Sequence, residues 1–176
     1  MKRVLWIFIL LFSFNMLVSA QVQFIESEKS HVEFEVKKFK MFNVDGTIKG
    51  MKGTIRFDST NLDNSSFMVC IEPSSIETGI KKRDNHLKSA DFFDVEQYDK
   101  ICFTSEIFKK TSEGYVVEGL LGIRDLSKNV SIPFTFKNKV FQGTFEINRL
   151  DFGVGKETSK FMAGNKIEVK IACHVK

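Results

Sequence analysis

The chain has 176 residues, of which 43% are hydrophobic and 27% charged, with three cysteines, nineteen phenylalanines and a formal net charge of +4. This balance excludes a disordered chain, which combines low hydrophobicity with high net charge, and three cysteines are too few for a disulfide-stabilised scaffold. The charge is too small to indicate a nucleic-acid-binding protein, and the length fits a single domain.

The first twenty residues predict a secretory signal peptide. The positive pair Lys2-Arg3 precedes an apolar run over Val4–Phe14, and the segment ends in the small-residue sequence Val18–Ala20. This order is typical of a cleaved export signal, and the apolar run is too short for a spanning helix. We therefore expect residues 1–20 to be removed, residues 21–176 to form one periplasmic or secreted domain, and no stable insertion into a membrane.

After the predicted signal, apolar residues alternate with charged or polar ones in short runs. The apolar positions of these runs are Val32, Phe34, Val36, Ile55, Phe57, Phe67, Val69, Ile71, Ile101, Phe103, Ile132, Phe134, Phe136, Phe145, Ile147, Ile167, Val169, Ile171 and Cys173. A period of two predicts strands with one apolar and one solvated face, as in antiparallel sheets. Turns are expected where glycine, asparagine and aspartate interrupt the runs, at Asp45-Gly46, Asn61–Ser66, Glu113-Gly114 and Gly153–Gly155.

The predicted fold class is therefore all-β, an antiparallel barrel of about eight strands, with a sandwich as the alternative. One helical excursion is expected over Ile80–Ala90, with Thr78 or Asp84 as its N-terminal cap. Eight closed strands leave an interior that side chains fill or that holds one apolar ligand. The pattern itself does not choose between a filled and a hollow barrel.

The sequence gives little sign of catalytic or metal chemistry. Its three histidines are widely spaced and form no metal-binding pattern, and no phosphate loop, nucleophile elbow or dinucleotide fingerprint is present. We therefore expect no metal and no cofactor. Cys173, on an apolar face, is interpreted as a small buried hydrophobe. A disulfide between Cys70 and Cys102 requires their strands to be neighbours, which the sequence leaves open.

The least generic stretch is Ser75–Gly79 followed by Arg83–Val95. It resembles the signature of the YceI-like family of exported, polyisoprenoid-binding proteins. Further matches lie at Ser30–Val36, in the segment Val44–Phe57 and at Gly143–Gly155, so the resemblance covers essentially all of the chain after the predicted signal.

The resemblance implies an elongated, lipocalin-like barrel whose apolar interior holds an isoprenoid chain or a comparable amphiphilic lipid. Phenylalanine supplies apolar area without a donor that needs a partner, so we interpret the many phenylalanines as the lining of a lipid site. Arg83, His86 and Arg149 are candidates to contact a polar headgroup. The candidate wall residues are Val32, Phe34, Val69, Ile71, Ile101, Phe103, Val117, Phe134, Phe145, Ile147 and Val169.

Three functions stay open, and a homodimer is also open. The first is a carrier of a hydrophobic small molecule, without chemistry. The second is an enzyme acting on a lipid-like substrate, with His86 as acid or base beside Asp84 or Asp91. The third is an interaction or stress-response module with a filled barrel. The sequence shows no set of nucleophile, base and orienting group, which favours structural roles for the motif: His86 with Asp91 pinning the excursion to nearby strands, and Arg149 pairing with Asp151 across a turn.

Overall fold

The structure, a computed structural model, describes residues 22–38 and 42–176, so the signal peptide predicted for residues 1–20 lies outside it. The strands are β1 (Val22–Phe24), β2 (His31–Lys38), β3 (Phe42–Ile48), β4 (Lys52–Arg56), β5 (Ser66–Ile71), β6 (Ile101–Lys110), β7 (Tyr115–Ile123), β8 (Leu126–Lys137), β9 (Val140–Asn148) and β10 (Lys166–His174). The helices are α1 (Lys81–Lys88) and the 3-10 turns η1 (Leu62–Asn64), η2 (Pro73–Ser75) and η3 (Arg149–Phe152).

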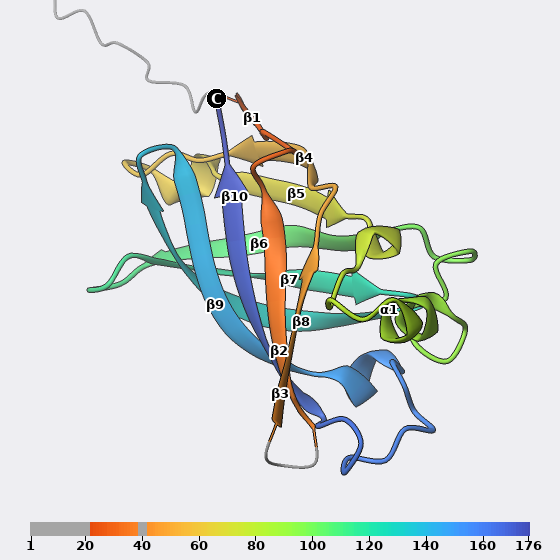
Figure 1. The fold of residues 1–176 in the computed structure, drawn as a ribbon. Helices are drawn as coiled ribbons and strands as arrows, with labels where there is room; N and C mark the ends of the chain where they lie inside the picture. Colours follow the sequence, from red (N-terminus) through yellow and green to blue (C-terminus); the bar gives the residue numbers. More distant parts are fainter. Residues whose placement is uncertain (1–21, 39–41) are drawn as a thin grey trace, which may run out of the picture.

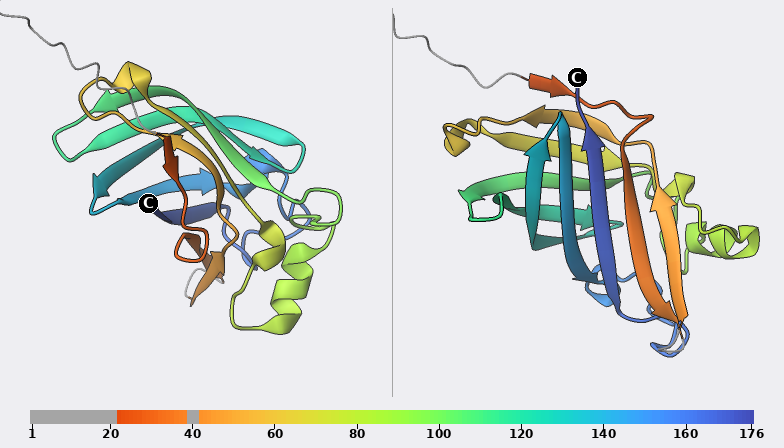
Figure 2. Two further views of the ribbon diagram at one scale, coloured as in Figure 1. Left: turned by 90° about the horizontal axis from the view of Figure 1, so that it is seen from above. Right: turned by 60° about the vertical axis from the view of Figure 1, so that its left-hand side comes forward.

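The ten strands form one antiparallel sheet in the order β1-β4-β5-β6-β7-β8-β9-β10-β2-β3. The sheet curls round on itself, as the views in Figures 1 and 2 show, so that one face of every long strand points inward. This confirms the predicted all-β, antiparallel barrel. Within the described residues the strands number ten rather than about eight. Three of them lie outside the alternating runs: β1 and β3, which are the two edges of the sheet, and β7, of which only Val117 was predicted.

The turn predicted at Asp45-Gly46 is wrong, because both residues lie in the middle of β3. Gly46 pairs directly with Phe34 of β2, and a Cβ at Gly46 would lie 2.3 Å from the Phe34 ring atom Cζ. Because Gly46 has no side chain, the Phe34 ring of β2 can lie over the backbone of β3. Close approach of this kind is a common reason for glycine inside a strand.

The predicted helical excursion is present as α1 but is capped differently. Its N-cap residue is Ile80, which makes no side-chain cap hydrogen bond. The Asp84 carboxylate instead accepts hydrogen bonds from the backbone N–H and the hydroxyl of Thr78, and so ties the helix to the preceding segment. Within the residues described, no helix has the length and apolar character needed to cross a bilayer.

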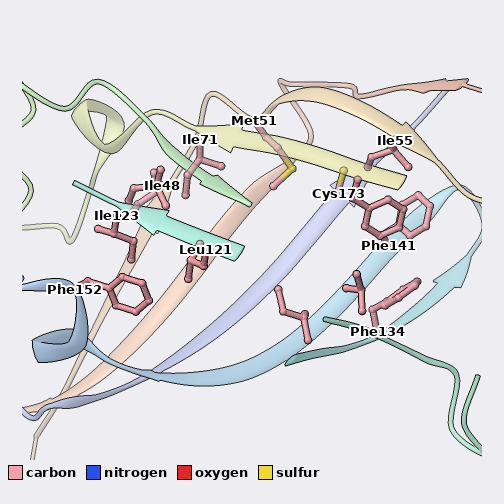
Figure 3. Packing of buried hydrophobic residues seen from close by; sticks show 14 of the residues in the cluster. Ile48, Met51, Ile55, Ile71, Leu121, Ile123, Phe134, Phe141, Phe152 and Cys173 are labelled. Atoms are coloured by element: carbon pink, nitrogen blue, oxygen red, sulfur yellow. The ribbon is translucent and has the colours of Figure 1, made fainter. Parts of the chain in front are cut away.

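One end of the barrel is closed by a cluster of seven aromatic side chains. Their ring centroids lie 4.2 to 6.4 Å apart, mostly in edge-on pairs, an arrangement that stabilises aromatic pairs beyond the area they bury. Figure 3 shows two of them, Phe134 and Phe141, at the opposite end of the interior from Phe152. The members of this aromatic cluster are Phe57, Phe67, Phe108, Tyr115, Phe134, Phe136 and Phe141.

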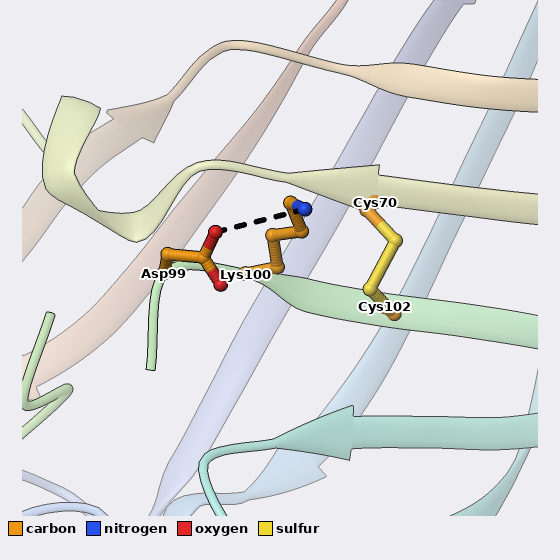
Figure 4. Close-up of a disulfide and its surroundings, with 4 residues drawn as sticks. All are labelled: Cys70, Asp99, Lys100 and Cys102. Carbon is orange, nitrogen blue, oxygen red and sulfur yellow. Dashed lines mark ion pairs between the residues drawn. A yellow bond between two sulfur atoms is a disulfide. The ribbon is translucent and has the colours of Figure 1, made fainter. Parts of the chain in front are cut away.

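A disulfide joins the wall between β5 and β6. Cys70 and Cys102 are directly opposite each other on these strands, their Cα atoms are 4.1 Å apart, and their sulfurs are bonded (Figure 4). This resolves the pairing that the sequence left open. Cys173 is a free, buried cysteine, as predicted from its place on an apolar face.

Candidate functional site

The interior of the barrel contains a cavity of about 620 Å³. Ligand pockets in proteins typically enclose about 300–1,000 Å³, so the space is large enough for one small molecule. Among the described residues that line it there is no aspartate or glutamate, and most are aliphatic or phenylalanine. Since an uncompensated polar group is costly to desolvate, such a wall suits a ligand with a long apolar portion.

All eleven wall residues predicted from the sequence line this cavity. Five are buried, namely Ile71, Ile101, Val117, Phe134 and Val169. The other six are only partly buried because they face open space rather than packed neighbours, and they are Val32, Phe34, Val69, Phe103, Phe145 and Ile147. That a ligand contacts these side chains stays a prediction.

The wall also contains residues that the sequence reasoning missed. Val44 and Ile48 of β3 were hidden by the misplaced turn, although they continue the inward alternation of that strand. Leu121 and Ile123 follow Val117 at the same period on β7, so a stricter reading of the alternation would have found them. Met51, 1% exposed, comes from the connection between β3 and β4, where no periodicity points to it.

Only part of the phenylalanine set that was interpreted as lipid lining faces the cavity. Phe34, Phe103 and Phe145 line the cavity. Phe57 and Phe136 do not line it and instead pack within the aromatic cluster. Both groups occupy the apolar positions of alternating runs, because rings that close the end of the barrel and rings that line the cavity both face inward.

The cavity reaches the surface between α1 and the segment 149–165, which we call the mouth loop. Four lining residues there remain exposed to solvent: Ile80, Lys82 and His86 on the helix side, and Met162 on the mouth loop. Figure 1 shows α1 and the mouth loop at the same end of the barrel. This mouth lies opposite the aromatic cluster.

Two of the three predicted headgroup residues lie on the helix side of the mouth. The Arg83 guanidinium donates from Nε to the Thr78 hydroxyl and from one terminal nitrogen to the Thr78 carbonyl, both at 2.7 Å. His86 Nε2 lies 3.1 Å from the Asp91 carboxylate, and its ring meets Phe92 edge-on. The predicted contact between His86 and Asp91 is therefore present. It joins α1 to the turn that follows, whereas the expected link was to nearby strands.

Arg149 also lines the cavity, but it is 5% exposed and its donors are already engaged. Its guanidinium donates to five backbone carbonyls and one side-chain amide of the mouth loop, those of Val154, Gly155, Thr158, Ala163, Gly164 and Asn165. Burial lowers the pKa of the group from its ordinary value. The pairing predicted with Asp151 is wrong, because that carboxylate accepts from Asn148 instead. Arg149 shapes the mouth loop and has no donor left for a headgroup.

The site offers little for covalent or metal chemistry. Burial raises the pKa of the Cys173 thiol to about 12, so this cavity-lining sulfur is protonated at neutral pH and is a poor nucleophile. Within residues 22–38 and 42–176, no group of three histidine, cysteine or acidic side chains is arranged to hold a metal ion. His86 and Asp91 form an imidazole–carboxylate pair at the edge of the cavity.

Comparison with known proteins gives consistent matches in sequence and in fold. The model of the YceI-like domain matches residues 24–175. Protein YceI of Escherichia coli is 31% identical over 163 residues, covering 92% of this chain and 80% of that protein. BcnA of Burkholderia cenocepacia superposes with a TM-score of 0.77 at 23% identity, over 85% of this chain and 98% of that one. A polyisoprenoid binding domain from Saccharophagus degradans, implicated in plant cell wall breakdown, gives a TM-score of 0.67 at 12% identity, over 88% and 97%.

Proposed function

The chain belongs to the YceI-like family, and on this premise we propose that it is an exported carrier of a polyisoprenoid or a similar amphiphilic lipid. The observation that supports this most directly is the apolar cavity of about 620 Å³. Transfer of a lipid chain from water into such a space is favoured by about 25 cal/mol per Å² of apolar surface. The name of the Saccharophagus degradans domain, a structural relative, points to the same class of ligand.

The cavity supports one orientation for the bound lipid. The apolar chain extends toward the aromatic cluster, because Phe67, Phe134 and Phe141 line the cavity at the closed end. The headgroup stays at the mouth, close to Arg83 and His86. Arg149 is not one of the proposed headgroup contacts, because carbonyls of the mouth loop occupy its donors.

The exported location is part of the proposal, and it has support beyond the predicted signal. Disulfides persist mainly in oxidising compartments such as the periplasm, and Cys70 and Cys102 form one on the barrel wall. Fractionation of cells that express the full chain is expected to place the protein outside the cytoplasm, with a mass that corresponds to the chain without residues 1–20. Full-length protein in the cytoplasm would contradict this part of the proposal.

The carrier function is tested by purifying the protein from cells under mild conditions and identifying co-purified lipid by mass spectrometry. Adjacent residues on β5 provide a matched pair of variants, since Val69 lines the cavity and Met68 points outward and is 60% exposed. Val69→Phe fills part of the cavity and is expected to lower the lipid content severalfold. Met68→Phe adds an aromatic ring to the outer face and is expected to leave it unchanged. A wild-type protein that is repeatedly lipid-free and takes up no polyprenol would overturn the proposal.

The contact between His86 and Asp91 keeps an enzyme as the second candidate, because it places an acid–base pair at the edge of the cavity. His86→Ala separates the two functions. A carrier with this substitution folds and retains most of its lipid, whereas an enzyme would bind its substrate and fail to convert it. Analysis of the bound lipid before and after incubation shows which outcome holds.

A further inference from the structure

Large apolar side chains are exposed around the mouth of the cavity. Of the ten exposed ones among the described residues, five are in the segments that form this end of the barrel. Ile80 and Met162 both line the cavity while 53% and 48% exposed, so the outer apolar surface continues into the interior. Exposed apolar surface of this kind marks interaction sites. The five residues are Phe42, Ile80, Leu150, Phe161 and Met162.

The segments that carry them are held together at this end. The mouth loop meets the β2–β3 hairpin through the Gly164 N–H, which donates to the Lys37 carbonyl at 2.7 Å. Figure 1 shows the mouth loop between the lower ends of β2 and β3 on one side and α1, above it at the right, on the other. Ile80 and Met162 therefore border the opening itself, and Phe42, Leu150 and Phe161 lie in segments at the same end of the barrel.

Four exposed lysines lie in the same segments, Lys81 and Lys82 on α1 and Lys156 and Lys160 in the mouth loop. Within the part of the chain that the structure describes, none of the four is in an ion pair. Elsewhere on the surface some lysines are paired with glutamates, as Lys52, Lys109 and Lys166 are. Others, such as Lys137, are like the four lysines at the mouth in having no ion pair among the described residues.

The carboxylates near the mouth offset this charge only partly. Asp84 accepts hydrogen bonds from Thr78, Asp91 contacts His86, and Asp151 accepts from Asn148. These three bind partners within their own segments, and Asp94 and Glu157 are two further acidic residues. Residues 81–95 and 149–165 together hold seven lysines and arginines against five acidic residues. The mouth thus combines apolar side chains with a surplus of positive charge.

We propose that this end of the barrel docks on an anionic lipid bilayer, with Ile80 and Met162 entering the headgroup region and the four lysines facing anionic headgroups. Apolar side chains bordered by lysines are the chemistry by which proteins bind in the membrane interface. The inference rests on the proposed carrier function. With the mouth against the bilayer, a lipid chain passes between membrane and cavity without crossing water.

Co-sedimentation with vesicles tests the docking directly. The wild-type protein is expected to bind vesicles of equal parts phosphatidylcholine and phosphatidylglycerol, to bind phosphatidylcholine alone much more weakly, and to be released by high salt. In the variant Lys81→Gln/Lys156→Gln/Lys160→Gln, partitioning onto the anionic vesicles should fall roughly a hundredfold, since each lysine near such a surface contributes about fivefold. Ile80→Ser/Met162→Ser should lower partitioning onto both kinds of vesicle.

Matched controls come from the outer wall of the barrel. Met68 and Leu120 are 60% and 41% exposed and lie on β5 and β7, so Met68→Ser/Leu120→Ser removes similar apolar surface away from the mouth. Lys110→Gln/Lys137→Gln/Lys139→Gln, at exposed positions near the aromatic cluster, removes the same charge as the mouth variant. Both controls are expected to bind vesicles like the wild type. No wild-type binding to anionic vesicles, or an equal loss in controls and mouth variants, would overturn the docking proposal; a partner protein would then be the remaining occupant.

A second assay distinguishes failure of the docking from failure of the carrier function. The lysine variant replaces no cavity-lining residue, so its uptake of a polyprenol supplied in detergent should equal that of the wild type, while its uptake from anionic vesicles is slow. Equal uptake from both sources by the wild type and the variant would contradict docking and leave the carrier function standing. No uptake by the wild type from either source would contradict the carrier function, whatever the vesicle binding.

Discussion

The two ends of this barrel differ in how they are built and in which side chains they expose. At the closed end, seven aromatic rings pack against one another inside the hairpins. At the mouth, a helix of eight residues and a loop organised by one buried arginine stand beside an opening. The closed end gains stability from apolar contact, whereas the mouth keeps apolar and basic side chains exposed. The difference places a packed end and an open end at opposite ends of the barrel axis.

The largest expected effect comes from loosening the closed end. Phe57 contacts five aromatic rings and is 7% exposed without lining the cavity. Phe57→Ala is expected to lower the free energy of unfolding by about 3–5 kcal/mol, as for other buried phenylalanines. Met162→Ala at the mouth, where the side chain is exposed, should cost less than about 1 kcal/mol. Denaturant unfolding measures both. Equal losses would show that the two ends do not differ in this way.

The disulfide on the wall is expected to have the next largest effect. Cys70 and Cys102 are 32 residues apart in the chain, and a bridge that closes a loop of this size stabilises a fold by about 2–4 kcal/mol. The variant Cys70→Ser/Cys102→Ser should unfold at correspondingly lower denaturant concentration and still take up lipid, because neither residue lines the cavity. Cys173→Ser is the control for general loss of a thiol. A double variant as stable as the wild type would contradict the prediction.

A single substitution at Arg149 is expected to loosen the mouth loop. Lysine in its place keeps the charge but lacks the planar fork of donors, so several carbonyls of the mouth loop lose their partner, at a cost of about 2 kcal/mol. Arg149→Lys should expose the loop to trypsin after Lys156 or Lys160. Digestion followed by mass spectrometry measures this, with Arg56→Lys on the exposed face of β4 as the control. A loop that resists trypsin as in the wild type would show that the arginine does not hold it.

The smallest expected effect is the pH dependence of the stability that Asp58 contributes at the closed end, next to Phe57 of the aromatic cluster. Asp58 accepts hydrogen bonds from the Thr60 hydroxyl, from two backbone N–H groups and from Asn64, and the first of these does most to lower the pKa of its carboxyl from 3.8 to about 2. A lowered pKa means that folding favours the carboxylate. Its stabilising contribution is therefore complete above pH 3.8 and is lost as the pH falls through about 2.

Asp58→Asn should accordingly be less stable than the wild type at neutral pH, and the difference between their melting temperatures should shrink across this acidic range. Asp63→Asn changes an exposed carboxylate of the same turn and serves as the control. A difference in melting temperature that stays the same at every pH would contradict the prediction. It would show that Asp58→Asn destabilises the protein for a steric reason and not through the loss of the negative charge.

The sequence predicted the walls of this barrel better than its ends. Period-two alternation assigns a side chain to the inside or the outside, which is why Val69 lines the cavity and Met68 does not. Alternation says nothing about position along the strand, so it could not separate Phe57 in the plug from Phe103 in the lining. The turn predicted at Asp45-Gly46 was wrong, because glycine at this position leaves space for the neighbouring Phe34 ring rather than forming a turn. The role of Arg149 depends on six contacts within a loop that has no periodicity.

The central claim is that the closed end receives the apolar chain and the mouth receives the headgroup. A crystal structure of the protein saturated with a polyprenyl phosphate tests it most directly. We predict a chain that runs along the cavity to Phe67, Phe134 and Phe141, with its phosphate between α1 and the mouth loop near Arg83. A lipid bound on the outer face of the sheet, or one whose phosphate lies against the aromatic cluster, would contradict the account.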